Sequence, residues 1–195
     1  HRFHIGGLDT SASFTRAAIT HGYINDGGHL AVNKLHYNDG TMFGCNTEFV
    51  STMISQTNQY GARINNAYDK GNSLSNHYYL DNNPQNDYKS QLAQQMRYVA
   101  QMISGGMKTK VYILNLNGFD THGNQVDTND TTLGEHADLL KEMSDAIYAF
   151  EDDLSLLQLD HRVMGMSFSE FGRQIASNGS DGTDHGDAAP LFIFG

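Results

Sequence analysis

The spacing of apolar residues predicts helices in three parts of the chain. Between residues 88 and 104, apolar side chains recur every three or four residues and two glycines follow, which predicts an amphipathic helix with a glycine stop. The same spacing continues from residue 133 to 159, with Ile147 on the apolar face, and predicts a longer helix there. A broken apolar stripe indicates a further helix from residue 46 or 47 to about residue 68.

Short runs of β-branched and aromatic residues predict strands only in the second half. They cover residues 111–116, 162–168 and 191–194, and the first two flank the longest predicted helix. A strand, a long helix and a second strand form a βαβ unit, whose strands lie parallel. We therefore expect residues 110–195 to form a βαβ core, and residues 1–109 to form a loop- and helix-rich portion of the same domain.

Charge and composition exclude some classes of partner. The chain of 195 residues has 22 acidic and 12 basic side chains, which argues against binding nucleic acid or an anionic membrane. An acidic surface that only keeps the protein in solution is the simpler explanation. No apolar run is long enough to span a bilayer, and a single cysteine, Cys45, excludes an internal disulfide. The abundance of Asn and Gly indicates a secreted, periplasmic or cell-surface protein.

Two carboxylate–imidazole pairs are the strongest signs of chemistry. Asp120 and His122 follow the first predicted strand, and Asp184 and His185 lie between glycines further along the chain. Oxygen and nitrogen donors together suit zinc or manganese, and the many acidic loops also admit calcium. Because the carboxyl ends of parallel strands meet at one edge of a sheet, we expect the two pairs to converge there as a divalent metal site. The alternative is that Asp120 caps a turn beside an ordinary loop histidine, His122, and that Asp184 and His185 belong to a polar surface turn that residues 178–182 would suit.

Glu170 and Arg173 are the candidate catalytic residues, because they follow the second predicted strand. Glu170 could act as a general base or a metal ligand, and the Arg173 guanidinium could hold a phosphate or sulfate group. An ordinary ion pair between the two side chains, three residues apart, is the alternative.

Several short motifs resemble one known family. The segments Asn117–His122, Ser167–Arg173 and Gly182–Gly186, with Asn178-Gly179 between the last two, are similar in order and spacing to the domain of unknown function 1501 family. The resemblance runs from about residue 110 to residue 195. That family is grouped with the alkaline-phosphatase-like superfamily of phosphatases, sulfatases and phosphoglycerate mutases.

The resemblance implies a three-layer α/β/α sandwich around a mostly parallel sheet, with an irregular N-terminal part and a two-metal site. It implies that Asp120 and His122 are ligands from one loop, and that Asp184 and His185 belong to an Asp-His-Gly ligand motif. A competing alignment puts Glu170 in the place of that Asp and matches His185 to a later histidine, which leaves one ion or none.

The implied function is a metal-dependent hydrolase acting on phosphate or sulfate esters, with a small-molecule or glycan ester as substrate. The superfamily's nucleophile loop has no match in residues 1–44, so we expect this sequence to be only part of the full domain. The alternative is a non-catalytic secreted or surface protein that keeps the fold and binds a glycan or a protein partner.

Overall fold

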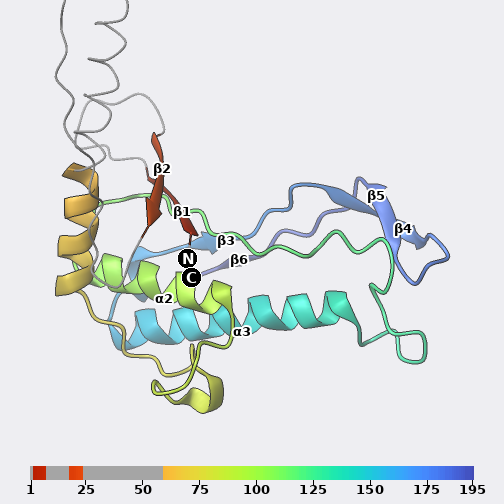
Figure 1. Ribbon diagram of the computed structural model, residues 1–195, viewed down its shortest axis with the longest axis horizontal. Helices are drawn as coiled ribbons and strands as arrows, with labels where there is room; N and C mark the ends of the chain where they lie inside the picture. The colour runs from red at the N-terminus through yellow and green to blue at the C-terminus, as the bar shows by residue number, and fades with distance from the viewer. Residues whose placement is uncertain (1, 8–17, 24–58) are drawn as a thin grey trace, which may run out of the picture. The chain divides into compact units, whose positions relative to one another are not determined.

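The computed structural model describes residues 2–7, 18–23 and 59–195, and Figure 1 draws the other residues as a grey trace. The helix predicted from residue 46 is seen as helical residues 59–70, and its first part lies outside the described residues. The chain divides into two units, each described by itself below. One takes residues up to 72 together with 98–114, and the other takes residues 73–97 and 115–195.

The first unit contains an antiparallel pair of strands, β1 (Arg2–Gly7) and β2 (Ala18–Tyr23). It also contains helical residues 59–70 and the second half of helix α2 (Gln91–Ser104). The ends of these two helices touch through backbone at Gly71 and Gly105. A Cβ atom at Gly71 would lie 1.8 Å from the Gln101 carbonyl oxygen, so only glycine permits this approach.

Helix α2 follows the predicted pattern. Leu92, Met96 and Val99, which recur at the expected spacing, are all buried. The helix starts where the Ser90 hydroxyl accepts a hydrogen bond from the Ala93 backbone N–H at 3.1 Å. It ends before Gly106, whose φ of 85° is the left-handed conformation that terminates helices.

Helix α3 (Glu135–Leu156), in the second unit, confirms the longest predicted helix with slightly shorter bounds. Phe150 and Leu154 are buried as the periodicity predicts, but Ala146 and Ala149 are buried as well. Ile147, expected on the buried apolar face, is only partly buried. The buried face of α3 therefore differs from the predicted one. Alanine side chains are small, so Ala146 and Ala149 can be buried although a pattern of large apolar residues does not mark them.

A buried carboxylate joins α3 to the segment at the start of the second unit. Asp153 is fully buried. It accepts hydrogen bonds from the Ser73 hydroxyl at 2.7 Å and from the Leu74 and Ser75 backbone N–H groups at 2.6 and 3.2 Å. Burial, and then the Asp153 charge, raise the pKa of the neighbouring Tyr78 hydroxyl far above its usual range. This network fixes residues 73–75 against the helix.

Two short strand pairs complete the second unit. β3 (Gly165–Met166) pairs with β6 (Ile193–Phe194), and β4 (Gly172–Ser177) forms a hairpin with β5 (Thr183–Gly186). The β4–β5 hairpin lies by the loop that precedes α3, away from β3 and β6 (Figure 1). Two 3-10 turns, η1 (Leu80–Asn82) and η2 (Asp160–Arg162), lie in the connections.

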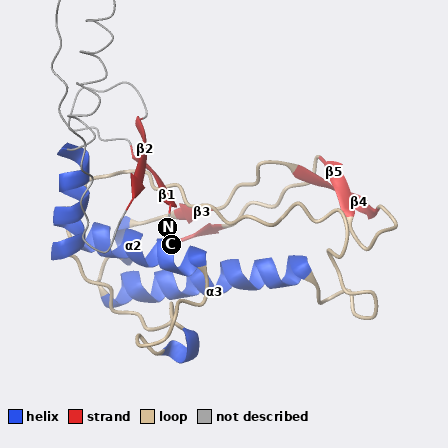
Figure 2. Cartoon of the chain, in the orientation of Figure 1, coloured by secondary structure: helices blue, strands red, loops and turns tan. Residues whose placement is uncertain are grey.

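The expected three-layer α/β/α sandwich around a mostly parallel sheet is wrong for the described residues. Every strand pair among them is antiparallel, and each sheet has two strands. Residues 111–116 belong to no strand, as the tan loops of Figure 2 show, and Val111 and Ile113 are each 44% exposed. The predicted strand 162–168 shrinks to β3, whose partner runs the opposite way, so α3 does not connect parallel strands. Hydrophobic runs indicate extended, partly buried chain, but they do not specify a pairing partner.

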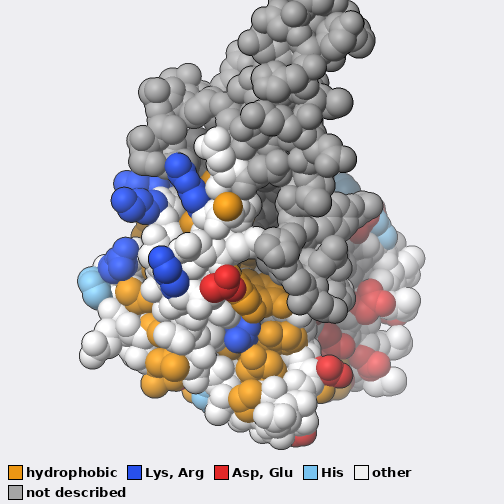
Figure 3. Space-filling model, turned by 60° about the vertical axis from the view of Figure 1, so that its left-hand side comes forward, with side chains coloured by type: hydrophobic (Ala, Val, Ile, Leu, Met, Phe, Trp, Pro, Cys, Tyr) orange, Lys and Arg blue, Asp and Glu red, His pale blue; other side chains and the backbone are white. Residues whose placement is uncertain are grey.

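Several large apolar side chains are exposed on the surface of the described residues. Figure 3 shows hydrophobic side chains reaching the surface among polar ones on the face it draws. In the second unit, Met164, Phe168 and Ile193 are each at least 67% exposed. Within the described part of the chain, no helix has the length and apolar character needed to cross a bilayer.

Candidate metal centre

The loop before α3 carries the first carboxylate–imidazole pair, and it is fastened through Gln125. The side chain of Thr121, between Asp120 and His122, is buried and donates a hydrogen bond to Gln125 Oε1 at 3.0 Å. Thr183, at the start of β5, donates to the same oxygen at 2.8 Å. One amide oxygen thus ties the loop to the hairpin. The two threonines that donate to it belong to the same two segments as His122 and His185.

The turn of the β4–β5 hairpin lies directly against this loop. Backbone N–H groups of Asn124 and Val126 donate to the carbonyl oxygens of Ser180 and Asp181 at 3.2 and 3.1 Å. Gly182 is buried at the contact, and a Cβ atom there would lie 2.4 Å from the His122 carbonyl oxygen. The glycine in this motif therefore allows two backbones to meet.

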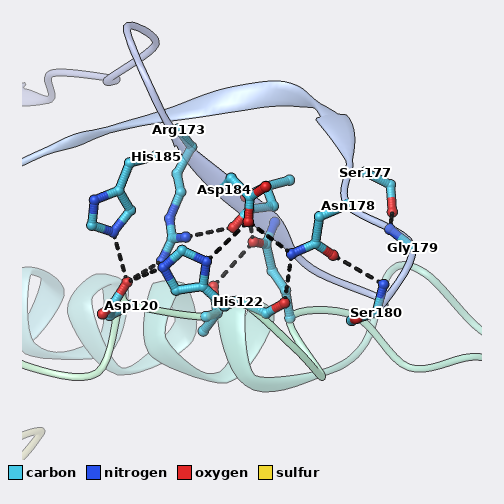
Figure 4. Close-up of polar contacts among 12 residues, drawn as sticks. Asp120, His122, Arg173, Ser177, Asn178, Gly179, Ser180, Asp184 and His185 are labelled. Atoms are coloured by element: carbon cyan, nitrogen blue, oxygen red, sulfur yellow. Dashed lines mark hydrogen bonds and ion pairs between the residues drawn. The ribbon is translucent and has the colours of Figure 1, made fainter.

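The four predicted ligand residues come together at this contact. Asp120 Oδ1 lies 3.1 Å from His122 Nε2 and 2.8 Å from His185 Nε2. His122 Nδ1 lies 3.1 Å from Asp184 Oδ1, so the His122 ring sits between two carboxylates (Figure 4). Their side chains are 48–60% exposed. The pairs meet as expected, but between a loop and an antiparallel hairpin instead of at the edge of a parallel sheet.

Arg173 belongs to the same network, with its guanidinium turned toward the protein. Nη1 donates to the Thr183 carbonyl at 2.6 Å, and Nη2 donates to the Phe119 carbonyl at 2.5 Å and to Asp120 Oδ1 at 3.1 Å. Its side chain is only 17% exposed. In this arrangement Arg173 fastens the loop to the hairpin and holds the Asp120 carboxylate.

Glu170 is exposed, and no hydrogen bond or ion pair joins it to any residue in the described ranges. The structure therefore does not bring this candidate into the network of Asp120 and Arg173. The ion pair between Glu170 and Arg173 is not formed either, because Arg173 lies in β4 and its donors face other partners.

Sequence reasoning missed the residues that orient the histidines. The Phe171 ring stacks on His185 with ring centres 4.2 Å apart and an 11° angle between planes. Asn178 Nδ2 donates to the His122 carbonyl at 2.7 Å and to Asp184 Oδ1 at 3.1 Å. Both residues stand in the matched motifs, yet a motif match does not say which neighbour a side chain contacts.

The electrostatics of the site keep its carboxylates ionised. The hydrogen bond from His185, helped by the nearby His122 and Arg173 charges, lowers the pKa of Asp120 below its usual range. Hydrogen bonds from Asn178 and then His122 lower the pKa of Asp184 in the same direction. Both carboxylates, which are ionised at neutral pH like any ordinary aspartate, therefore stay charged to a lower pH.

The replacement His185→Phe is expected to raise the pKa of Asp120 toward its ordinary value, because the ring stack is kept while the main hydrogen bond is lost. A depressed carboxyl pKa stabilises the folded site above the ordinary pKa, and that stabilisation is lost as pH falls through the folded value. Carbon-detected NMR titration measures the shift. Asp130, whose pKa is lowered by Thr132, serves as the internal control and should not move. An unchanged Asp120 titration would contradict the assigned cause.

Three of these side chains form a group that fits a divalent ion. One ligand atom each from Asp120, His122 and His185 lies within 4.8 Å of the other two. An ion about 2 Å from each donor places neighbouring donors roughly 3.4 Å apart, so small side-chain movements would complete the set. One carboxylate and two imidazoles match zinc or manganese better than calcium, which prefers oxygen. The half-exposed side chains leave room for further ligands from solvent.

Comparison with known proteins identifies the family of this chain. Residues 46–195 match the family described as a protein of unknown function, DUF1501. No curated protein and no solved structure matches this chain. The match extends well before the motifs that carry the site, so it covers both the α2 region and the metal-binding candidates.

Proposed function

Because this chain belongs to the DUF1501 family of proteins of unknown function, we propose its activity from its site: it is a metal-dependent hydrolase of phosphate or sulfate esters. The supporting observation is the meeting of Asp120, His122 and His185 from two distant segments, with ligand atoms within 4.8 Å. The motif Asp184-His185-Gly186, which resembles the ligand motif of the alkaline-phosphatase-like superfamily, supplies the choice of reaction.

Zinc or manganese is the proposed ion. When bound, it supplies Lewis-acid chemistry to an ester. Asp120 would bring the negative charge that offsets the ion, and its lowered pKa keeps the carboxylate ionised to a lower pH than an ordinary aspartate. His122 and His185 bring nitrogen donors from opposite sides of the loop–hairpin contact. The exposure of all three side chains suits a substrate that approaches from solvent, such as a small-molecule or glycan ester.

Arg173 contributes by positioning in this proposal. Its donors face two carbonyl oxygens and Asp120, so it fixes the carboxylate at the mouth of the site. A general-base role for Glu170 rests on its place in the sequence alone.

Hydrolysis of p-nitrophenyl phosphate and p-nitrophenyl sulfate tests the proposal. Wild-type protein loaded with zinc or manganese is expected to turn over one of them, and chelation is expected to stop turnover. His185→Phe should be inactive under the same conditions. Asp181→Asn is the matched control, because it removes a hairpin carboxylate that contacts Thr128 and not the site. Turnover that survives chelation, or no turnover by metal-loaded wild type, would contradict the hydrolase proposal.

A further inference from the structure

We infer that Asp184 positions His122 and is not itself a ligand of the ion, an inference that rests on the proposed metal centre. The two ring nitrogens of His122 face different carboxylates. Nε2 lies 3.1 Å from Asp120 Oδ1, and Nδ1 lies 3.1 Å from Asp184 Oδ1. The lone-pair directions of the two nitrogens diverge, so an ion held by Nε2 lies on the side of the ring away from Asp184. Consistent with this, Asp184 is outside the three-residue ligand group.

Asp184 is itself held in place by the hairpin turn. The Asn178 side-chain amide donates to Asp184 Oδ1 at 3.1 Å and to the His122 backbone carbonyl at 2.7 Å (Figure 4). The Asn178 amide therefore holds both the Asp184 carboxylate and the His122 backbone, while the Asp184 carboxylate orients the His122 ring. The contact at Gly182 brings the two segments close enough for this linkage.

The hydrogen bond has a chemical consequence for His122. An ionised carboxylate only accepts hydrogen bonds, so the Nδ1 atom that faces Asp184 carries the proton. The Nε2 atom, which faces Asp120, would then have its lone pair free for an ion. A carboxylate on the far nitrogen of a metal-binding histidine fixes its tautomer and ring orientation and raises its basicity.

His185 is held by other contacts, so the positioning role of Asp184 concerns His122 alone. His185 Nε2 faces Asp120, and its ring is oriented by stacking on Phe171. Loss of Asp184 is therefore expected to weaken the hold on His122 and to leave His185 in place. With Asp184 outside the donor set, Asp120, His122 and His185 would hold one ion, where the superfamily resemblance implies two.

Binding of zinc to the full chain, by competition titration, tests the inference, with cobalt as a spectroscopic probe of the ligands. Asp184→Ala is expected to lower zinc affinity by about 10–100-fold, the range for lost outer partners of metal ligands. Asp184→Asn should lower zinc affinity less than Asp184→Ala does. An amide oxygen at the place of Oδ1 can still accept hydrogen bonds from both His122 Nδ1 and Asn178 Nδ2. Cobalt-saturated variants should keep the wild-type visible spectrum, because the donor set is unchanged. Asp181→Asn should bind like wild type.

Two outcomes overturn this inference alone. Zinc affinity in Asp184→Ala equal to wild type would show that Asp184 does not position His122. A cobalt spectrum altered in both Asp184 variants, with an affinity loss as large as that of His185→Phe, would show that Asp184 is a ligand. Wild-type protein that takes up neither zinc nor cobalt would instead overturn the proposed metal centre, and the inference with it.

Discussion

Asp153→Ala is expected to lower the free energy of unfolding by roughly 2–4 kcal/mol, because it leaves one buried and two partly buried donors without their acceptor. Asp153 is fully buried in α3 and accepts three hydrogen bonds, two of them from the backbone N–H groups of Leu74 and Ser75. Alanine cannot accept any of them.

Urea unfolding followed by circular dichroism measures this effect. Asp153→Asn should lower the free energy of unfolding less than Asp153→Ala does. Its amide oxygen can still accept hydrogen bonds from the Leu74 and Ser75 backbone N–H groups, and its amide nitrogen can donate to the Ser73 hydroxyl. Asp152→Ala is the neighbouring control. Its carboxylate is 30% exposed and 4.0 Å from His77 Nε2, so the change should stay within about 0.5 kcal/mol. Equal stability of the Asp153→Ala variant and wild type would show that this network does not stabilise the unit.

Gly182→Ala is expected to separate the hairpin from the loop that carries Asp120 and His122. The new Cβ atom would lie 2.4 Å from the His122 carbonyl oxygen and 2.8 Å from the Gly123 nitrogen, both backbone atoms that cannot rotate away. Overpacking of this kind costs roughly 1–3 kcal/mol of stability. We also expect weaker zinc binding, because ligand atoms must be held within about 0.5 Å of the productive geometry.

Thermal unfolding and zinc titration of the same variant check both effects. Gly179→Ala is the control, because a Cβ atom there meets nothing within 4 Å and only its φ of 83° disfavours alanine. It should lose about 1 kcal/mol of stability and keep its zinc affinity. Zinc affinity that falls equally in both variants, or in neither, would contradict the role assigned to the contact at Gly182.

The helices could be predicted from sequence because local spacing determines them. α2 and α3 were expected within a few residues of their bounds, since a 3.6-residue apolar period is visible in both segments and a glycine stop follows α2. Strand pairing was not predictable in the same way. β3 is part of an extended apolar run, but its antiparallel partner is the distant β6, with Gly165 paired to Phe194 and Met166 paired to Ile193, and nothing in either segment specifies the other.

The meeting of the four candidate ligand residues was predicted, but the elements that bring them together were not. The two carboxylate–imidazole pairs meet, yet they meet at the β4–β5 hairpin, whose first strand is mostly polar, is exposed beyond Arg173 and shows no apolar alternation. The residues that hold the pairs together could not be identified by spacing. Arg173 and Gln125 act through hydrogen bonds to residues more than 50 positions away or across the loop contact, and such partners depend on the tertiary structure.

Metal content tests the central claim most directly. Wild-type protein, exposed to zinc and passed through a desalting column, is expected to retain about one ion per chain by elemental analysis, as three protein ligands would hold. Asp120→Ala and His185→Phe should retain none while keeping the wild-type circular dichroism spectrum, and Asp181→Asn should retain as much as wild type. The same zinc content in wild type, Asp120→Ala and His185→Phe would contradict the assignment of these residues as a metal centre.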